Sequence, residues 1–306
     1  SSALVAPSPH VDVHMSPDGA NMVCTDCHTT HGHEWPGSRY LGTVKDERAP
    51  VPGRRRDDVA SCDSCHGREP HDATTLTGLK LNGHTDRVAC QTCHIPEFAK
   101  GGVATKTWWD WSTAGRLDGE GRPIHEEGPL GRHSYLSTKG DFRWGEDVVP
   151  DYAFWNGVVE YTLLGEDIEP DGVVGINRIG GSPDDPGSVI YPFKRMRGKQ
   201  AYDKVHEHLL LNQVWGPDTD TALWTNFDYS KSLAAGMAAT DVAYSGEYGF
   251  VETEMWWPTT HMVAPADEAL ECDACHAKEG RLAGVGGFYL PGRDGFETTD
   301  RVGLAA

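Results

Sequence analysis

The eight cysteines and four of the histidines form the most regular chemical pattern in this 306-residue chain. The cysteines fall in four pairs, each with two residues between its members, and a histidine directly follows every pair. Disulfides, structural zinc sites and thioredoxin-like redox pairs also use paired cysteines, but none needs a histidine at the same adjacent position every time. The pattern is typical of covalent haem c attachment and predicts four haems, bound through Cys24, Cys27, Cys62, Cys65, Cys90, Cys93, Cys272 and Cys275.

The spacing of each motif suits this chemistry. Two cysteines three positions apart on a helical turn present both sulfurs to one porphyrin, and the next residue points toward the iron from the same side. We therefore expect His28, His66, His94 and His276 to be the proximal iron ligands. Because thioether attachment takes place outside the cytoplasm, the motifs also predict an exported protein, either periplasmic or at the cell surface.

A second set of histidines lies three to eleven residues from the motifs: His14, His31, His71, His84 and His261. The proximal histidine and the chain itself occupy the near side of each haem, so we expect these residues to bind the irons of neighbouring haems. Five candidates compete for four positions, which leaves one that is structural or that reaches a haem on another subunit. His10 and His33 are weaker alternatives, and methionine ligation by Met15 or Met262 is disfavoured by the abundance of histidine.

The identity of the sixth ligand decides the kind of function. An iron bound by two histidines cycles between redox states with no open position for a substrate, whereas an iron without a sixth ligand can bind and reduce a small molecule. The supply of extra histidines favours electron transfer over catalysis. No catalytic side chain can be selected from the sequence.

Composition restricts the partners. The formal net charge of −19 and a pI near 5.1 argue against nucleic acid and anionic membranes as partners, because both require a basic face. Apolar stretches are only a few residues long, so we expect no membrane span. The opening "SSALVAPSP" is interpreted as a mature N-terminus left after removal of a signal peptide.

The distribution of glycine and proline suggests the fold class. With 36 glycines and 19 prolines, we expect a multihaem cytochrome c with little regular secondary structure, mainly short helices and loops around the haems, with at most a small β-hairpin. The expected helices cover Ala266–Leu282 and Asp228–Ala243, the latter capped by Asp228 or Ser230. Val189–Phe193 and Gly157–Leu164 are the expected strands.

The spacing of the motifs suggests how this single domain is organised. We expect a three-haem segment over residues 1–100, a tryptophan-rich insert without haem over 101–260, and a fourth-haem segment over 261–306.

Several long segments resemble a known family. "NGHTDRVACQTCHIPEFAKGG" (82–102), "TKTWWDWSTAG" (105–115), "YSGEYGFVETEMWWPTTHMVAPADEALECDACHAKEGRL" (244–282) and "GFYLPGRD" (287–294) are similar to the octaheme tetrathionate reductase family of multihaem cytochromes c. The resemblance runs from about residue 20 to about residue 295 and implies a multihaem cytochrome c fold, with His84 and His261 at distal-ligand positions.

The departures from that family bear on activity. Its members carry eight haems, and their catalytic haem is attached through a Cys-x-x-Cys-Lys motif, whereas every motif in this chain ends in histidine. The chain therefore resembles the electron-transfer part of such an enzyme without its catalytic part, and the family's activities are not carried over. "CTDCHTTHG" with the preceding His14 also resembles tetrahaem cytochromes that polymerise into extracellular filaments (nanowires), which use an axial histidine from the adjacent subunit.

The sequence thus predicts a tetrahaem c-type cytochrome that transfers electrons through bis-histidine haems in the cell envelope or outside the cell, with a filament subunit as one form. The expected partners are other cytochromes or copies of the same chain. The alternative is an oxidoreductase that reduces a small sulfur or nitrogen oxyanion (tetrathionate, nitrite) or hydroxylamine at one open haem.

Overall fold

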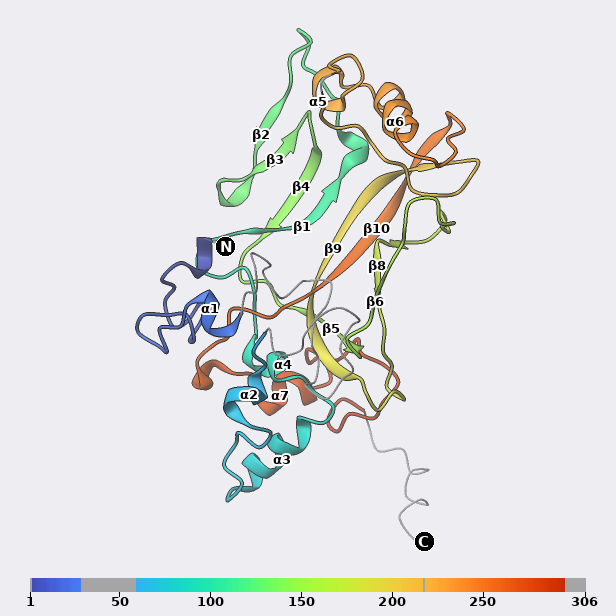
Figure 1. The fold of residues 1–306 in the computed structure, drawn as a ribbon. Helices are drawn as coiled ribbons and strands as arrows, with labels where there is room; N and C mark the ends of the chain where they lie inside the picture. The colour runs from blue at the N-terminus through green and yellow to red at the C-terminus, as the bar shows by residue number, and fades with distance from the viewer. Residues whose placement is uncertain (1, 29–58, 217, 295–306) are drawn as a thin grey trace.

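The computed structural model describes residues 2–28, 59–216 and 218–294 (Figure 1). The four haem motifs form one-turn helices, and each helix begins at the first cysteine of its motif. They lie together below the large sheet in Figure 1 and are α1 (Cys24–Cys27), α2 (Cys62–His66), α4 (Cys90–His94) and α7 (Cys272–His276).

Three further α-helices are α3 (Leu76–His84), α5 (Leu223–Asn226) and α6 (Tyr229–Ala238). The Asp228 carboxylate accepts a hydrogen bond from the Lys231 backbone N–H, so the predicted helix from Asp228 is confirmed, although it ends earlier than expected. Short 3₁₀ turns are η1 (Ser2–Leu4), η3 (Trp111–Thr113), η4 (Pro129–Gly131) and η5 (Ala266–Glu268). No helix in the described ranges is both long and apolar enough to cross a membrane.

The expected continuous helix over Ala266–Leu282 is wrong. η5 ends after Glu268, and both Ala269 and Glu271 have extended backbone dihedrals before α7 starts at Cys272. The physical reason is that the residue before every motif is extended, so each haem-binding turn starts as a separate helix.

A large mixed sheet occupies the middle of the chain. Its strand order is β2-β3-β4-β1-β9-β10-β7, and β5 also pairs with β9. Its strands are β1 (Thr105–Asp110), β2 (His125–Glu127), β3 (His133–Leu136), β4 (Gly140–Gly145), β5 (Asp151–Trp155), β7 (Val174–Gly175), β9 (Val189–Asp203) and β10 (Tyr248–Pro258). β6 (Val159–Tyr161) and β8 (Asn177–Ile179) form a separate two-stranded sheet.

The expectation of little regular structure holds around the haem motifs and is wrong for residues 105–258. Both predicted strands exist, but Val189–Phe193 is only the start of the 15-residue β9, and Gly157–Leu164 contains only β6. The two do not form a hairpin with each other, because β6 pairs with β8 while β9 pairs with β1, β5 and β10.

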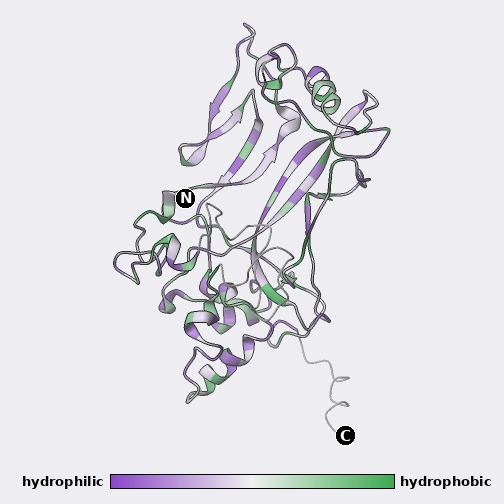
Figure 2. Ribbon diagram, viewed as in Figure 1, coloured by the Kyte–Doolittle hydropathy of each residue, from purple (hydrophilic) through white to green (hydrophobic). Residues whose placement is uncertain are grey.

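β9 is apolar and buried at its start and basic farther along. Val189–Phe193 is buried and pairs with β5, and Tyr191 and Phe193 pack against Trp155 with ring centroids 4.9 and 5.5 Å away. The following stretch from Lys194 to Lys199 is rich in basic residues, and Figure 2 shows β9 green at its start and more hydrophilic beyond it. The apolar end of β9 therefore anchors the sheet to the protein core.

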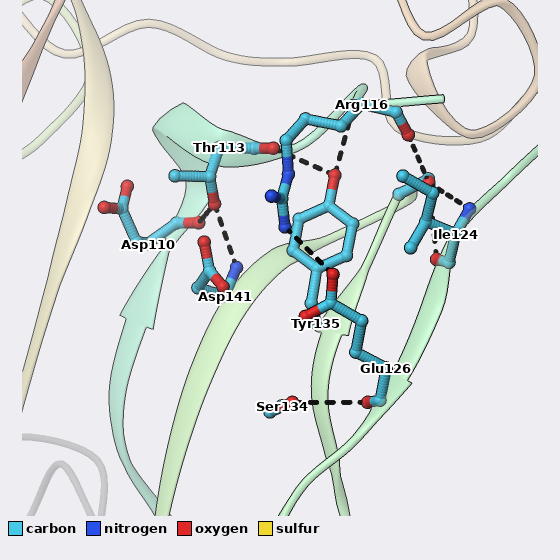
Figure 3. Close-up of polar contacts among 9 residues, drawn as sticks. Asp110, Thr113, Arg116, Ile124, Glu126, Ser134, Tyr135 and Asp141 are labelled. Atoms are coloured by element: carbon cyan, nitrogen blue, oxygen red, sulfur yellow. Dashed lines mark hydrogen bonds and ion pairs between the residues drawn. The ribbon is translucent and has the colours of Figure 1, made fainter. Parts of the chain in front are cut away.

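A buried tyrosine on β3 holds together the part of the sheet formed by β2, β3 and β4 (Figure 3). Tyr135 is 0 % exposed; its hydroxyl donates to the Thr113 carbonyl at 3.0 Å and accepts from the Arg116 backbone N–H at 3.1 Å. The Arg116 guanidinium lies 3.7 Å from the Tyr135 ring centroid and pairs with Glu126. These contacts hold η3 against β2 and β3, and the hydrogen bond from the Asp141 N–H to the Thr113 hydroxyl adds β4.

Asp203 is the last residue of β9 and binds the backbone of the loops that follow β9 and precede β10. Its side chain is 0 % exposed and accepts hydrogen bonds from the backbone N–H groups of Val205, His206 and Ser245 and from the Ser245 hydroxyl. Burial alone acts to raise the pKa of Asp203, but the hydrogen bonds to its ionised form outweigh burial and hold the pKa at about 2.

We predict that Asp203 contributes acid-sensitive stability. Because its folded-state pKa lies below the unfolded value, the contribution is complete above about pH 4 and is lost as pH falls through about 2. Denaturant unfolding of wild type and Asp203→Asn should therefore differ clearly at pH 6 and converge near pH 2. A stability difference that stays constant over this range would contradict the prediction.

Candidate haem-binding sites

Each haem motif forms a single helical turn that brings two cysteine side chains to one side. All eight cysteines are free of disulfides. Burial raises the pKa of Cys93 to about 12, and the charge of Cys275 adds to this effect. Burial therefore favours the neutral thiol of Cys93 over the thiolate of a nucleophilic cysteine.

The motif helices contact one another in a defined order. The Ala60 N–H donates to the Cys27 carbonyl at 2.8 Å, which joins the start of α2 to α1. The side chains of Cys62 and Cys90 contact each other and join α2 to α4. The Leu270 N–H donates to the Cys93 carbonyl at 3.0 Å, which joins the segment before α7 to α4. The resulting order is α1, α2, α4, α7.

Each motif histidine faces a second histidine from another part of the chain. The ring centroids are 6.0 Å apart for His14 and His66 and 6.2 Å apart for His28 and His261. The other two pairs are His71 with His94 at 6.3 Å and His84 with His276 at 6.2 Å. In every pair, the second histidine faces a motif other than the one nearest to it in sequence.

These separations fit an iron atom between two imidazoles. A histidine nitrogen lies about 2 Å from a bound transition metal and the ring centre about 1 Å farther, so rings on opposite sides of one metal have centroids about 6 Å apart. The angles between the ring planes range from 15° to 85°, which this arrangement accommodates because each ring can rotate about its metal–nitrogen bond. The residues therefore fit haem c: two cysteines for the porphyrin and two imidazoles for the iron.

Hydrogen bonds from Nδ1 orient three of these rings. His84 Nδ1 bonds to the Lys80 carbonyl at 2.7 Å, and His276 Nδ1 bonds to the Pro291 carbonyl at 2.7 Å. A carbonyl only accepts, so Nδ1–H is the donor in both cases and Nε2 is left as the metal-binding nitrogen. His71 Nδ1 bonds to the Asn82 side-chain oxygen at 3.1 Å, and Asn82 also bonds both backbone groups of His71.

A buried carboxylate joins the segments that carry two other candidate ligands. Asp12 is 2 % exposed; its Oδ1 accepts from the backbone N–H groups of His14 and Met15 at 3.0 and 3.1 Å. Its Oδ2 accepts from the Met262 N–H at 2.8 Å, next to His261. A single side chain therefore positions His14 against α2 and His261 against α1.

Burial favours the neutral imidazole that an iron requires. It lowers the pKa of His94, with smaller contributions from the nearby histidines His71, His66 and His14. It also lowers the pKa of His261, where the charge of His28 acts in the same direction.

The other described histidines have partners outside these four pairs. His10 bonds to Glu268 at 2.6 Å. His125 and His133 lie 6.1 Å apart on β2 and β3, and His206 and His208 form a pair at the end of β9. His31 and His33 lie outside the described residues. Within the described ranges, no group of three or more histidine, cysteine or acidic side chains is arranged to hold a metal ion, so no zinc-type cluster is seen there.

The structure brings together each motif histidine and four of the five predicted distal candidates; their roles as iron ligands stay predictions. Sequence reasoning missed Asp12 and Asn82. Asp12 precedes His14 by two residues, the spacing of a carboxylate that caps a turn, and this was the available signal. Asn82 carried no signal, because its partner His71 lies eleven residues away.

Comparison with known proteins gives two matches. Residues 106–279, more than half of the chain, match the family model "Cytochrome c bacterial". The solved structure of an octaheme cytochrome c from Shewanella oneidensis is 36% identical, with a TM-score of 0.79 over 92% of this chain and 60% of that protein. This chain thus spans about three fifths of the length of that relative. No curated protein matches the chain by sequence.

The match supports the resemblance predicted from the sequence at the level of multihaem cytochromes c. The finer resemblances to tetrathionate reductases and to filament cytochromes stay predictions.

We predict that His84→Ala opens one haem iron. The variant removes the imidazole that faces His276, so the ferric protein should gain a high-spin electron paramagnetic resonance signal, and the reduced protein should bind carbon monoxide. His125→Ala removes an exposed histidine on β2 and is the matched control, for which both spectra should stay unchanged. A fully low-spin His84→Ala protein would contradict the assignment.

We predict that Asp12→Ala disturbs two haem sites together. Three backbone N–H groups lose a charged acceptor, and hydrogen bonds to charged groups contribute about 1.5–3 kcal/mol each, so a stability loss of about 3 kcal/mol or more is expected. High-spin signals should appear for the haems attached at α1 and α2, while Asp18→Ala, on the exposed part of the same loop, should have neither effect. A change confined to one haem would argue against the shared anchor.

Proposed function

The chain belongs to the family of bacterial cytochromes c, and from this premise we propose that it is an exported electron-transfer protein with four covalently attached haems. Members of this family carry covalently bound haem c. The number four follows from the four Cys-x-x-Cys-His motifs.

The observation that carries the proposal is the pairing of all four motif histidines. Every one of them has a second imidazole at 6.0–6.3 Å, so this chain would supply two imidazoles to each bound haem iron. Iron with two histidines exchanges single electrons with little change in geometry and leaves no position for a substrate.

The contacts between motifs suggest the course of the electrons. The proposed relay follows the order α1, α2, α4, α7, because contacts of Cys27, Cys62 and Cys93 join each helix to the next one or to the residues just before it. The haem at α1 and the haem at α7 are then the two ends, where electrons enter and leave. The partners at these ends are proposed to be other redox proteins of the cell envelope or exterior.

The chain's own residues fix the coordination that this function needs. When bound, haem supplies a one-electron redox centre. The Lys80 and Pro291 carbonyls hold the Nδ1–H groups of His84 and His276, so that Nε2 of each ring faces the iron. Asp12 holds the backbone of His14 and the residue after His261, which keeps both imidazoles in place through a redox cycle.

The sequence also predicted a reductase and a filament subunit, and the four histidine pairs bear on these two alternatives differently. A reductase of a small sulfur or nitrogen oxyanion requires an open haem, and the four internal histidine pairs disfavour it. A homopolymer joined by an axial histidine from a neighbouring copy requires the remaining candidate, His31, to displace one of the four internal partners. His31 lies outside the described residues, and filament assembly stays a prediction that electron microscopy of the purified protein tests.

The proposed function predicts a distinct set of spectra for the purified holoprotein. Mass spectrometry should show four haems per chain, the ferric protein should give only low-spin signals, and carbon monoxide should leave the reduced Soret band unchanged, because no axial position is open. A stoichiometric high-spin signal together with turnover of tetrathionate, nitrite or hydroxylamine would favour the reductase instead.

A further inference from the structure

One face of the sheet collects lysines although the chain as a whole has a net charge of −19. Lys106 is on β1, and Lys194 is on β9. Lys139 lies in the turn between β3 and β4. A bulge between Lys106 and Trp108 shifts the register, so that Lys106 lies opposite Trp144 and Trp109 lies opposite Phe142. This register places the ammonium group of Lys106 among aromatic rings.

Aromatic side chains surround the three ammonium groups. Lys106 Nζ lies 3.9 Å from the Trp109 ring centroid, 4.1 Å from Phe142 and 5.4 Å from Trp144. Lys139 Nζ lies 5.2 Å from Trp224, and Lys194 Nζ lies 5.4 Å from Trp257. All three lysines are partly buried.

Backbone and side-chain contacts fix the positions of these lysines. Trp109 Nε1 donates to the Lys139 carbonyl at 2.6 Å. This bond ties the backbone of Lys139 to the indole ring that the Lys106 ammonium group contacts. Lys194 Nζ donates to the Thr105 hydroxyl at 2.7 Å, at the start of the strand that carries Lys106. These contacts link the three lysines through neighbouring residues, and we call the set the lysine face.

Carboxylates pair with two other basic residues of β9. Arg195 pairs with Asp151 at 2.7 Å, and Lys199 pairs with Glu252 at 3.1 Å. Within the part of the chain that the structure describes, no ion pair joins Lys106, Lys139 or Lys194 to an acidic side chain. The lysine face thus gathers three positive charges without a counter-ion from the described residues.

Burial lowers the pKa of two of these lysines, and repulsion by the other two lysines adds to the effect on Lys106. Burial lowers the pKa of Lys106 to about 8, and the charges of Lys139 and Lys194 act in the same direction. Burial alone lowers the pKa of Lys194 to about 8. A negative group beside these lysines would offset both effects.

We propose that Lys106, Lys139 and Lys194 form a binding site for a small oxyanion with two or more negative charges, of the phosphate or polycarboxylate class. Three ammonium groups linked through neighbouring residues match the charge of such a ligand, and the partly buried setting that they share favours a small ion over the broader surface of a folded partner. The site is separate from the haem motifs and does not depend on the proposed electron-transfer function.

Isothermal titration of the holoprotein with inorganic phosphate and with citrate tests the site. We expect saturable binding of one anion per chain, which weakens as sodium chloride is raised from 50 to 200 mM because salt screens the charges. Lys106→Gln, Lys139→Gln and Lys194→Gln should each weaken binding about tenfold, since each removes a charged hydrogen-bond donor. Lys106→Arg retains the charge and should bind nearly as well as wild type.

Arg143→Gln is the matched control. Arg143 lies opposite Trp108 in the same strand pair, is exposed, and stacks over Trp108 at 4.8 Å without joining the lysine face. Equal weakening by Arg143→Gln and Lys106→Gln would show a non-specific charge effect and overturn the proposal. Absence of saturable binding would also overturn it, as would binding of a glutamate-rich peptide but of neither small anion.

Discussion

Four pairs of imidazole rings face each other at 6.0–6.3 Å, the separation expected for two ligands of one haem iron, and this cross-pairing organises much of the chain. A motif histidine supplies one ring from a rigid helical turn, so the other ring must come from elsewhere. In this protein His28 near the N-terminal end faces His261, and His84 faces His276 near the other end. Cross-pairing therefore joins the ends of the chain around the motif helices, where few long helices or strands exist to do so.

The sheet helps to position the C-terminal partner. Thr259, just after β10, bonds the Pro192 carbonyl of β9 through both its N–H and its hydroxyl, and His261 follows two residues later. The same end of β9 holds α4, because the Ile190 carbonyl accepts from the Ala89 N–H and the buried Thr92 hydroxyl. The buried start of β9 thus connects the third motif to the loop that carries His261, so residues 101–260 help to position the motif helices.

The sequence predicted features that depend on neighbouring residues, such as the haem motifs and a helix cap. It did not predict features that depend on residues far apart in the chain. Each motif was visible because the chemistry of one haem fits within five residues. The Asp228 cap was visible because it acts within three residues. The extent of β9 was not, since its partner β10 begins 45 residues after β9 ends and glycines interrupt both strands. For the same reason, the sequence indicated that His261 faces another motif but not that this motif is α1, and it gave no sign that Asp12 anchors both segments.

The charges of the sheet argue that it is more than a spacer between haem segments. Partial burial of an ammonium group carries a free-energy penalty unless a carboxylate or another negative group offsets it. Elsewhere on β9 and β10 that offset is present, as in Arg195 with Asp151. Lys106 and Lys194 instead rely on indole and phenyl faces, whose cation–π attraction offsets only part of the penalty. A face that served packing alone would be more stable with apolar side chains at these positions, so ammonium groups without a carboxylate partner support the proposed anion site.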